Sequence, residues 1–396
     1  MPSNFLSDSA STPTSNHPPS DSSVTAASSS SDSSSDALSL TSSSSSVASR
    51  LSEMWNYLWI PFMISLSKEL SLAKAQSGIF LPGEFEADSS SPRCTEPEPR
   101  LNYRPVIGIL SHPGDGASGR LSNATNASYI AASYVKFVES AGARVIPLIY
   151  NEPPDILFQK LNLVNGVLFT GGWCKSGRYR EVVEKIFKKI LEKNDAGDHF
   201  PLYAICLGFE LISVILTKDR SILEPFNAAD MASSLQFTKD LNIEGTVFQR
   251  FPPDLLKKLS TDCLAMQNHR YGISPERFQE NQYLSSFFKI LTTCKDEDDK
   301  VYVSTLQGRN YPVTAFQWHP EKNAFEWGYP TIPHSEDAIQ VTQHVANYLV
   351  SEARKSLNRP PTQKVLDNLI YNYKTTYCGR AGRGYDEVYI FTRSPM

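Results

Sequence analysis

Between residues 104 and 218, short apolar runs alternate with amphipathic stretches. Each run has the length and composition of a strand that is buried on both faces of a sheet. The runs are Pro105–Leu110, Arg144–Leu148, Gly166–Phe169 and Leu202–Ile205, and the predicted helices are Tyr129–Ala141, Arg180–Lys193 and Leu207–Lys218. This β-α-β-α rhythm with short connections predicts an α/β fold, in which helices cover both faces of a mostly parallel sheet.

The second half of the chain is richer in predicted strands. Val301–Leu306 and Val313–Trp318 are expected to be neighbouring strands, and Glu387–Phe391 is expected to be a final strand. Ser335–Ser356 is predicted as a long closing helix, because Ser335 is a good N-cap and acidic residues occupy the first turn. The folded domain is therefore expected to span residues 102–396.

The first hundred residues have a different composition. Residues 1–53 are rich in Ser and have almost no apolar surface to bury, so we expect a disordered leader. A short apolar block followed by an Ala-x-Ala pattern indicates a secretory signal peptide over residues 54–75, although no Lys or Arg lies between Met54 and Lys68. The alternative is an apolar stretch within the leader. Residues 76–101 are predicted to be a linker.

Charge and cysteine content narrow the classes of partner. The formal net charge is -4 and no basic patch dominates, which argues against a nucleic-acid partner. The apolar block is too short to cross a bilayer, which needs roughly 20 apolar residues. Six cysteines are spread along the chain without a Cys-x-x-Cys pair, so no structural zinc site is expected. Disulfide pairing among these cysteines stays open.

One cysteine stands at the junction of a predicted strand and a predicted helix. Cys206 follows Leu202–Ile205 directly, and Gly208 comes two residues later. Such a sharp turn exposes its central side chain above the carboxyl edge of a sheet. The helix N-terminus is expected to lower the thiol pKa below the free value of about 8.5 and to favour the thiolate. The alternative is a buried core cysteine, which is common in proteins.

A histidine follows another predicted strand. His319 is placed to reach the same sheet edge, to accept the thiol proton and later to protonate a leaving amine. Glu321 is placed to hold the far nitrogen of the imidazole, which would complete a Cys-His-Glu triad. The alternative is a structural histidine at a strand end. The occurrence of both motifs in one chain favours the catalytic interpretation.

Paired glycines follow the third predicted strand, in Thr170–Gly172. The backbone N–H of Gly172 is a candidate for an oxyanion hole, together with the N–H of Leu207. Glycine pairs are also common in ordinary turns, so this motif carries little weight alone. Cys174 and Lys175 follow the turn and are expected to lie near the same site.

In order and spacing, these three motifs resemble class I glutamine amidotransferases. Longer stretches are similar to the γ-glutamyl hydrolases of that superfamily, and the tail to Phe391 resembles the plant members. The stretches are Tyr129–Lys136, Glu139–Val145, Cys206–Glu210 and Gln317–Lys322. The resemblance implies an amidotransferase-like three-layer α/β sandwich. It assigns Cys206 as the nucleophile and His319 as the acid/base, with Glu321 a less firmly defined partner.

Four further residues are predicted to bind substrate. The resemblance places Tyr129, Glu210 and His269 at positions that line the family's site. An acid one helical turn after the nucleophile suits recognition of an α-amino group, and the charge of Arg270 suits polyglutamate carboxylates. The alternatives are core packing at a helix start for Tyr129 and a helix-surface carboxylate for Glu210.

The resemblance implies a cysteine hydrolase that cleaves the γ-glutamyl bonds of folyl-poly-γ-glutamates through a thioester, with no metal or organic cofactor. It also implies a homodimer in a vacuolar or secreted location, with no membrane association after processing. Overlapping sequons at Asn123 and Asn126 predict glycosylation if the leader is a secretion signal. Two alternatives stay open: a glutamine amidotransferase or glutaminase subunit, and a catalytically silent protein that binds γ-glutamyl compounds.

Overall fold

The computed structural model describes residues 96–116, 126–379 and 384–392. The predicted leader, the predicted signal peptide and most of the predicted linker lie outside the described residues, as does Asn123. The disordered leader, the signal peptide and the glycan at Asn123 therefore stay predictions.

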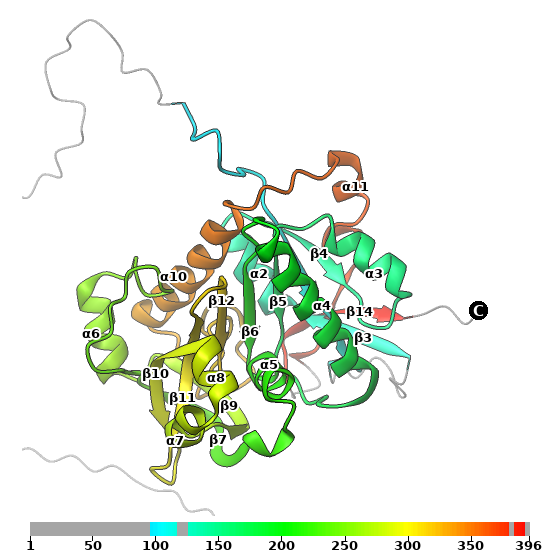
Figure 1. The fold of residues 1–396 in the computed structure, drawn as a ribbon. Helices are drawn as coiled ribbons and strands as arrows, with labels where there is room; N and C mark the ends of the chain where they lie inside the picture. Colours follow the sequence, from blue (N-terminus) through cyan, green and yellow to red (C-terminus); the bar gives the residue numbers. More distant parts are fainter. Residues whose placement is uncertain (1–95, 117–125, 380–383, 393–396) are drawn as a thin grey trace, which may run out of the picture. The chain divides into compact units, whose positions relative to one another are not determined.

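The largest sheet has eight strands in the order β4-β1-β5-β6-β12-β11-β10-β8 (Figure 1). Neighbours from β4 to β12 pair in parallel, and neighbours from β12 to β8 pair antiparallel. The strands are β1 Val106–Leu110, β4 Arg144–Leu148, β5 Gly166–Phe169, β6 Leu202–Ile205, β8 Gln236–Phe237, β10 Phe288–Lys295, β11 Val301–Gly308 and β12 Val313–Phe316. The mostly parallel sheet is confirmed, and its antiparallel strands lie together at one edge.

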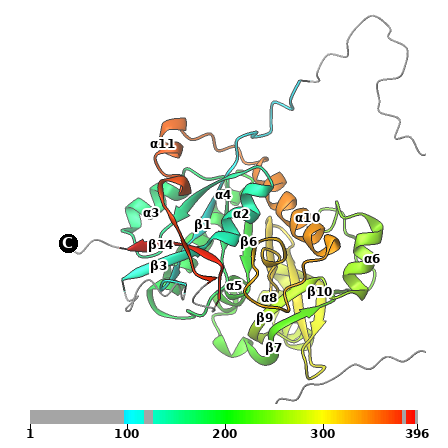
Figure 2. The same cartoon turned by 180° about the vertical axis from the view of Figure 1, so that it is seen from behind.

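Helices cover both faces of this sheet (Figures 1 and 2). One face packs with α2 Ala132–Ser140, α6 Pro253–Thr261 and α10 Glu336–Ala353. The other packs with α3 Pro154–Leu161, α4 Gly177–Asp195, α5 Leu207–Thr217, α7 Pro275–Glu280 and α8 Gln282–Phe287. The remaining helical elements are short. They are the helices α9 Lys322–Phe325 and α11 Thr362–Leu366 and the 3-10 turns Arg220–Ile222 and Ile370–Asn372. The predicted three-layer arrangement is confirmed.

Strand β1 shows why the apolar runs form the middle layer. All five of its residues are buried. Ile107 and Ile109 pack into the core on one face, whereas Val106 and Leu110 pack into the core on the other. Because successive side chains of a strand point to opposite faces, a strand covered on both faces must be apolar throughout. The long helix α10 also begins as predicted, since the Ser335 side chain accepts a hydrogen bond from the Ala338 N–H at 3.2 Å.

A second sheet of four strands, in the order β13-β14-β3-β2, corrects one prediction. Its strands are β2 His112–Pro113, β3 Ala127–Ala131, β13 Thr375–Tyr377 and β14 Glu387–Thr392. Tyr129 was expected to begin a helix, but it lies in β3, and the helix starts at Ala132. The reason is tertiary: Tyr129 pairs with Ile390 of β14, the predicted final strand of the tail.

A separate two-stranded antiparallel sheet of β7 Glu224–Ser233 and β9 Ala265–Gly272 carries the predicted residues His269 and Arg270. Its second strand is anchored to the main sheet next to β12, because the His319 N–H donates to the Met266 carbonyl at 2.8 Å. In the part of the chain that the structure describes, no helix is both long and apolar enough to cross a membrane.

Candidate active site

Four adjacent strands bring the predicted motifs to one edge of the main sheet. Strands β1, β5, β6 and β12 are parallel neighbours, so their carboxyl ends lie side by side. These ends are followed by His112, Gly172, Cys206 and His319 respectively. In parallel α/β sheets, ligands bind outside this edge. Cys206 and His319 are 113 positions apart in the sequence. The structure brings them together, and both line one pocket.

Cys206 occupies a strained turn between β6 and α5. Its φ is 51°, in the left-handed region that non-glycine residues rarely adopt. A Cβ on Gly208 would lie 2.9 Å from the Phe169 carbonyl oxygen, so only glycine lets α5 pack this close to β5. These features confirm the predicted strand-to-helix elbow, which holds the cysteine at the sheet edge.

The Cys206 thiol is buried, and this corrects the expected pKa. Burial, followed by the nearby carboxylates of Glu210 and Glu321, raises the thiol pKa well above its ordinary value. Lys175 and the N–H of Leu207 act in the opposite direction but do not outweigh the burial. The thiol is therefore protonated at neutral pH, and an attack by its sulfur requires a base to take the proton.

The base candidate, His319, lies next to the carboxylate of Glu321. Its Nδ1 is 2.8 Å from Oε1 of Glu321, whose side chain is fully buried. Burial alone would raise the Glu321 pKa, but the charge and hydrogen bond of His319 bring it below the ordinary value. The carboxylate accepts the Nδ1 proton, which leaves Nε2 as the nitrogen able to accept a further proton. A Cβ on Gly171 would lie 2.9 Å from His319 Cε1 and 3.5 Å from Cys206 Cβ, so this glycine makes room for both.

On one side of Cys206 lies a pocket of about 520 Å³. We call it the cationic pocket, since it contains the side chains of Lys175, Arg220 and Arg270. Two predicted substrate-binding residues, Glu210 and His269, also line it, and so does the predicted oxyanion residue Gly172. The structure therefore gathers most of the predicted site residues around one opening.

Glu210 is bonded to a neighbour within this pocket. Its Oε2 is 2.6 Å from Nζ of Lys175, which also lies 3.9 Å above the Tyr271 ring. Glu210 is 3% exposed, so it is not the helix-surface carboxylate of the alternative interpretation. Burial raises its pKa to about 7 against the opposing effect of Lys175. The carboxyl thus titrates near neutrality, and the ion pair is complete only above that pH.

The His269 ring is neutral, and its Nε2 atom can accept a hydrogen bond. Its Nδ1 is 2.9 Å from the Tyr271 carbonyl oxygen, which can only accept, so Nδ1 carries the proton. Burial lowers the pKa of His269 to about 3. Among the described residues, the buried Nε2 has no hydrogen-bond partner. An N–H group entering the cationic pocket would satisfy it.

On the other side of Cys206 lies a pocket of about 550 Å³. We call it the aromatic pocket, because Tyr129, Trp173, Tyr329 and Tyr385 line it. Both pockets are lined by Gly172, Trp173, Cys206 and Asn268, so they meet at the sulfur. Tyr129 is buried and its ring packs against Tyr385. It therefore both packs in the interior and lines a pocket, which were the two alternative roles predicted for it.

A family model for peptidase C26 matches residues 105–321, more than half of the chain, and this stretch contains Cys206, His319 and Glu321. The chain belongs to the peptidase C26 family. Gamma-glutamyl hydrolase 2 of Arabidopsis thaliana is 68% identical over 342 residues, covering 86% of this chain and 99% of the relative. Gamma-glutamyl hydrolase 1 of the same plant is 71% identical over 324 residues, covering 81% and 93%.

More distant proteins also match this peptidase C26 member. Gamma-glutamyl hydrolase of Mus musculus is 37% identical over 307 residues, covering 76% of this chain and 94% of the relative. Among solved structures, a glutamine amidotransferase from Thermotoga maritima aligns with 14% identity and a TM-score of 0.35, over 64% of this chain and 100% of its own.

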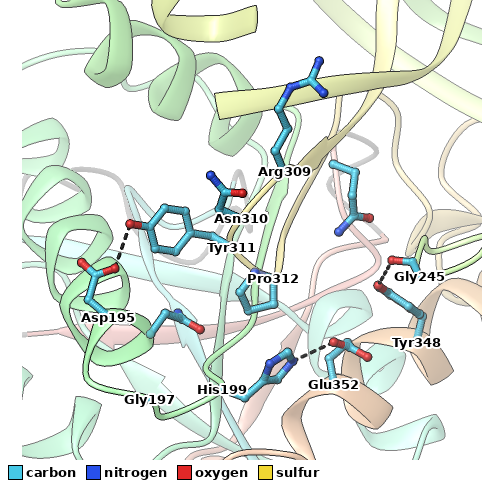
Figure 3. Close-up of a pocket in the computed structure, with 13 residues that line it drawn as sticks. Asp195, Gly197, His199, Gly245, Arg309, Asn310, Tyr311, Pro312, Tyr348 and Glu352 are labelled. Atoms are coloured by element: carbon cyan, nitrogen blue, oxygen red, sulfur yellow. Dashed lines mark hydrogen bonds and ion pairs between the residues drawn. The ribbon is translucent and has the colours of Figure 1, made fainter. Parts of the chain in front are cut away.

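In this peptidase C26 chain, another polar hollow lies at the amino ends of β6 and β12 (Figure 3). Its groups are bonded to one another: His199 to Glu352 at 2.7 Å, the Tyr311 hydroxyl to Asp195 at 2.9 Å, and the Tyr348 hydroxyl to the Gly245 carbonyl at 2.9 Å. We call it the amino-edge hollow. Because these polar groups are bonded within the hollow and it lies at the end of β6 opposite to Cys206, we do not regard it as a rival for the candidate active site.

Three residues at the site of this C26 protein were missed by sequence reasoning. Arg220 comes from the turn after α5, and Asn268 offers its carbonyl to the Cys206 thiol at 3.9 Å. His112 lies beneath the glycine turn, bonded to the N–H groups of Trp173 and Cys174. Of these three residues, only His112 could have been predicted from the sequence, because it follows a predicted strand whose end lies at the same sheet edge.

No cluster of three or more His, Cys, Asp or Glu side chains is placed to hold a metal ion in the described parts of the chain. Five cysteines of the described residues are free thiols: Cys174, Cys206, Cys263, Cys294 and Cys378. Cys174 lines the cationic pocket with Cys206, as expected from its position after the glycine turn.

Proposed function

We propose that this protein is a cysteine hydrolase that cleaves γ-glutamyl bonds of folyl-poly-γ-glutamates. The observation that carries the proposal is the buried Cys206, which lines two pockets and shares one of them with His319, whose ring is hydrogen-bonded to Glu321. The names of the related proteins from Arabidopsis thaliana and Mus musculus support the γ-glutamyl bond as the target.

In the proposed reaction, Cys206 attacks the γ-amide carbonyl while Nε2 of His319 takes the thiol proton. This order suits a thiol that is protonated at rest. Glu321 stabilises the imidazolium that forms, and the N–H groups of Gly172 and Leu207 bind the developing oxyanion. His319 then gives its proton to the leaving amine, and a thioester remains on the sulfur. Water, deprotonated by His319, hydrolyses the thioester.

The cationic pocket is proposed to bind the polyglutamate chain. Each γ-linked glutamate carries a free α-carboxylate, and arginine pairs with carboxylates through two parallel hydrogen bonds. Arg220 and Arg270 are exposed at this pocket and are available for such contacts. Nε2 of His269 is proposed to accept an amide N–H of the chain. Because Glu210 is bonded to Lys175, we propose that it orients this lysine toward the substrate rather than binding an α-amino group directly.

Location and assembly are proposed from the family resemblance. We expect a homodimer that resides in the vacuole or outside the cell. Asn126 is exposed in the structure, which supports a role as a glycosylation acceptor. Size-exclusion chromatography with light scattering tests the dimer, and glycosidase treatment of protein from its natural source tests the glycan.

The reaction is tested by product analysis with folyl-pentaglutamate. Wild-type protein is expected to yield shortened folates and free glutamate or short polyglutamates, and Cys206→Ala is expected to yield none. The chain lengths of the products reveal which bond is cut. Wild-type protein that leaves the substrate intact, while a control hydrolase shortens it, would refute the proposal.

A further inference from the structure

The glycine turn after β5 uses most of its N–H groups internally. The Gly171 N–H donates to the Tyr134 hydroxyl at 2.9 Å. The next two N–H groups beyond Gly172, those of Trp173 and Cys174, both donate to Nε2 of His112 at 3.1 Å. Among the residues that the structure describes, the Gly172 N–H has no such partner. It is thus a donor of this turn that is left for a ligand in the pockets that Gly172 lines with Cys206.

His112 has only one tautomer that fits this arrangement. Its Nδ1 is 2.8 Å from the Pro113 carbonyl oxygen, which can only accept, so Nδ1 carries the proton. Nε2 is then a lone-pair acceptor toward which two consecutive N–H groups converge. Burial lowers the pKa of His112 to about 4, which keeps the ring neutral at physiological pH. The rings of Tyr129, Trp173 and Tyr179 surround it edge-on and fix its orientation.

The glycine turn packs directly against the His112 ring. Gly172 has a φ of 149°, and a Cβ there would lie 2.3 Å from Cδ2 of His112. His112 itself is 1% exposed and lines neither pocket, so it does not touch a substrate. Its effect on the site is therefore indirect. Loss of its acceptor would leave two N–H groups unsatisfied, and the turn would have to rearrange to hydrate or pair them.

We propose that His112 is a positioning residue, which holds the glycine turn in the shape that aims the Gly172 N–H at the oxyanion. The inference rests on the proposed hydrolysis and adds to it the residue that shapes one half of the oxyanion hole. Tyr134 assists from the other side of the turn by accepting the Gly171 N–H.

The test compares two substitutions of the same residue. His112→Leu removes the acceptor, whereas His112→Gln keeps an acceptor oxygen near the position of Nε2. Removal of one oxyanion donor typically lowers kcat by roughly 10²- to 10³-fold, so we expect a loss of about 10²-fold in His112→Leu. The KM for folyl-pentaglutamate should stay within about threefold, and His112→Gln should recover at least about tenfold of the lost kcat.

Alkylation of Cys206 by iodoacetamide separates positioning from general damage. The alkylation rate depends on the thiol and not on an oxyanion, so we expect it to be unchanged in both variants, with thermal melting within a few degrees of wild type. If His112→Leu does not fold, His112→Gln is compared with Tyr134→Phe, which removes the other acceptor and should lower kcat with an unchanged alkylation rate.

Four results would overturn the inference. An active wild type whose His112→Leu variant keeps its kcat would overturn the positioning role alone. Equal losses in His112→Leu and His112→Gln, or a parallel fall in alkylation rate, would show a merely structural role. A wild type that hydrolyses no γ-glutamyl substrate would refute the proposed function, and the positioning role with it.

Discussion

Two histidine–glutamate pairs lie at opposite ends of strands β6 and β12. His319 and Glu321 are 2.8 Å apart at the carboxyl ends, and His199 and Glu352 are 2.7 Å apart at the amino ends. The first pair is almost fully buried, and its histidine lines one pocket with Cys206. In the second pair, the histidine is 34% exposed, and Glu352 also bonds to Lys355 at 2.5 Å.

The two pairs have the same short His–carboxylate contact in different surroundings, and we propose a catalytic role for the first pair only. At the amino edge, His199, Tyr311 and Tyr348 each have a hydrogen-bond partner within the hollow, and no non-glycine residue that lines it has a positive φ. At the carboxyl edge, Cys206 has a positive φ, and the buried Nε2 of His269 has no partner among the described residues. Such strain and unsatisfied polarity are costly and are concentrated where a ligand can make use of them.

The largest difference between the two pairs should be kinetic. Glu321→Gln keeps the side-chain shape but loses the charge that stabilises the His319 imidazolium, so we expect kcat to fall by roughly 10³- to 10⁴-fold. The matched change Glu352→Gln at the amino edge should leave kcat within about twofold. Steady-state hydrolysis of folyl-pentaglutamate measures both. Equal kinetics for the two variants would remove the distinction between the edges.

The pH dependence of stability should differ in sign between two buried glutamates. Burial raises the pKa of Glu210 from 4.5 to about 7, so its ionisation destabilises the fold as the pH rises through this range. Glu210→Gln should therefore gain stability relative to wild type between about pH 4.5 and pH 7, by up to about 3 kcal/mol.

Glu352 is the matched control. Burial opposes its ionisation, but the bonds from His199 and Lys355 lower its pKa below the ordinary value. Its contribution to stability is present above pH 4.5 and is lost as the pH falls through the lowered pKa. Glu352→Gln should thus be less stable than wild type at neutral pH, and the difference should shrink in acid. Urea unfolding at several pH values measures both slopes, and slopes of the same sign would contradict the assignment.

The smallest effect is expected at the entrance of the cationic pocket. Arg270 is exposed, and an exposed ion pair contributes about 0.2–1 kcal/mol, so Arg270→Ala should raise the KM for folyl-pentaglutamate by about two- to fivefold without changing kcat. Arg270→Lys keeps the charge and should recover part of the loss. The effect should weaken in high salt and with shorter chains. A KM that is insensitive to chain length would place the polyglutamate elsewhere.

Local sequence was sufficient to place the residues that we propose as catalytic. The turn at Cys206 depends on an apolar strand, one cysteine and Gly208, all within seven residues of the chain. His319 and Glu321 are separated by one residue, so their contact is also encoded locally. The order of the parallel strands then places these motifs at one edge, because parallel strands connected through helices share their direction.

Long-range pairing explains what the sequence did not reveal. Tyr129 lies in a strand because β14, some 260 positions later in the numbering, pairs with it. His112 and Trp173 are 61 positions apart, and nothing in either segment indicates their hydrogen bond. The prediction of a low thiol pKa was also wrong, since the burial of Cys206 depends on strand β9 and on the glycine turn, which both lie against it. Helix position alone could not show that burial.

The central claim is that the reaction passes through a thioester on Cys206, and hydroxylamine tests it most directly. A thioester partitions between water and hydroxylamine, so wild-type protein with folyl-pentaglutamate and hydroxylamine should yield a γ-glutamyl hydroxamate. Cys174→Ala, which removes the neighbouring thiol of the cationic pocket, should do the same, and Cys206→Ala should yield none. Continued hydrolysis without hydroxamate at saturating hydroxylamine, or hydroxamate formation by Cys206→Ala, would contradict the account.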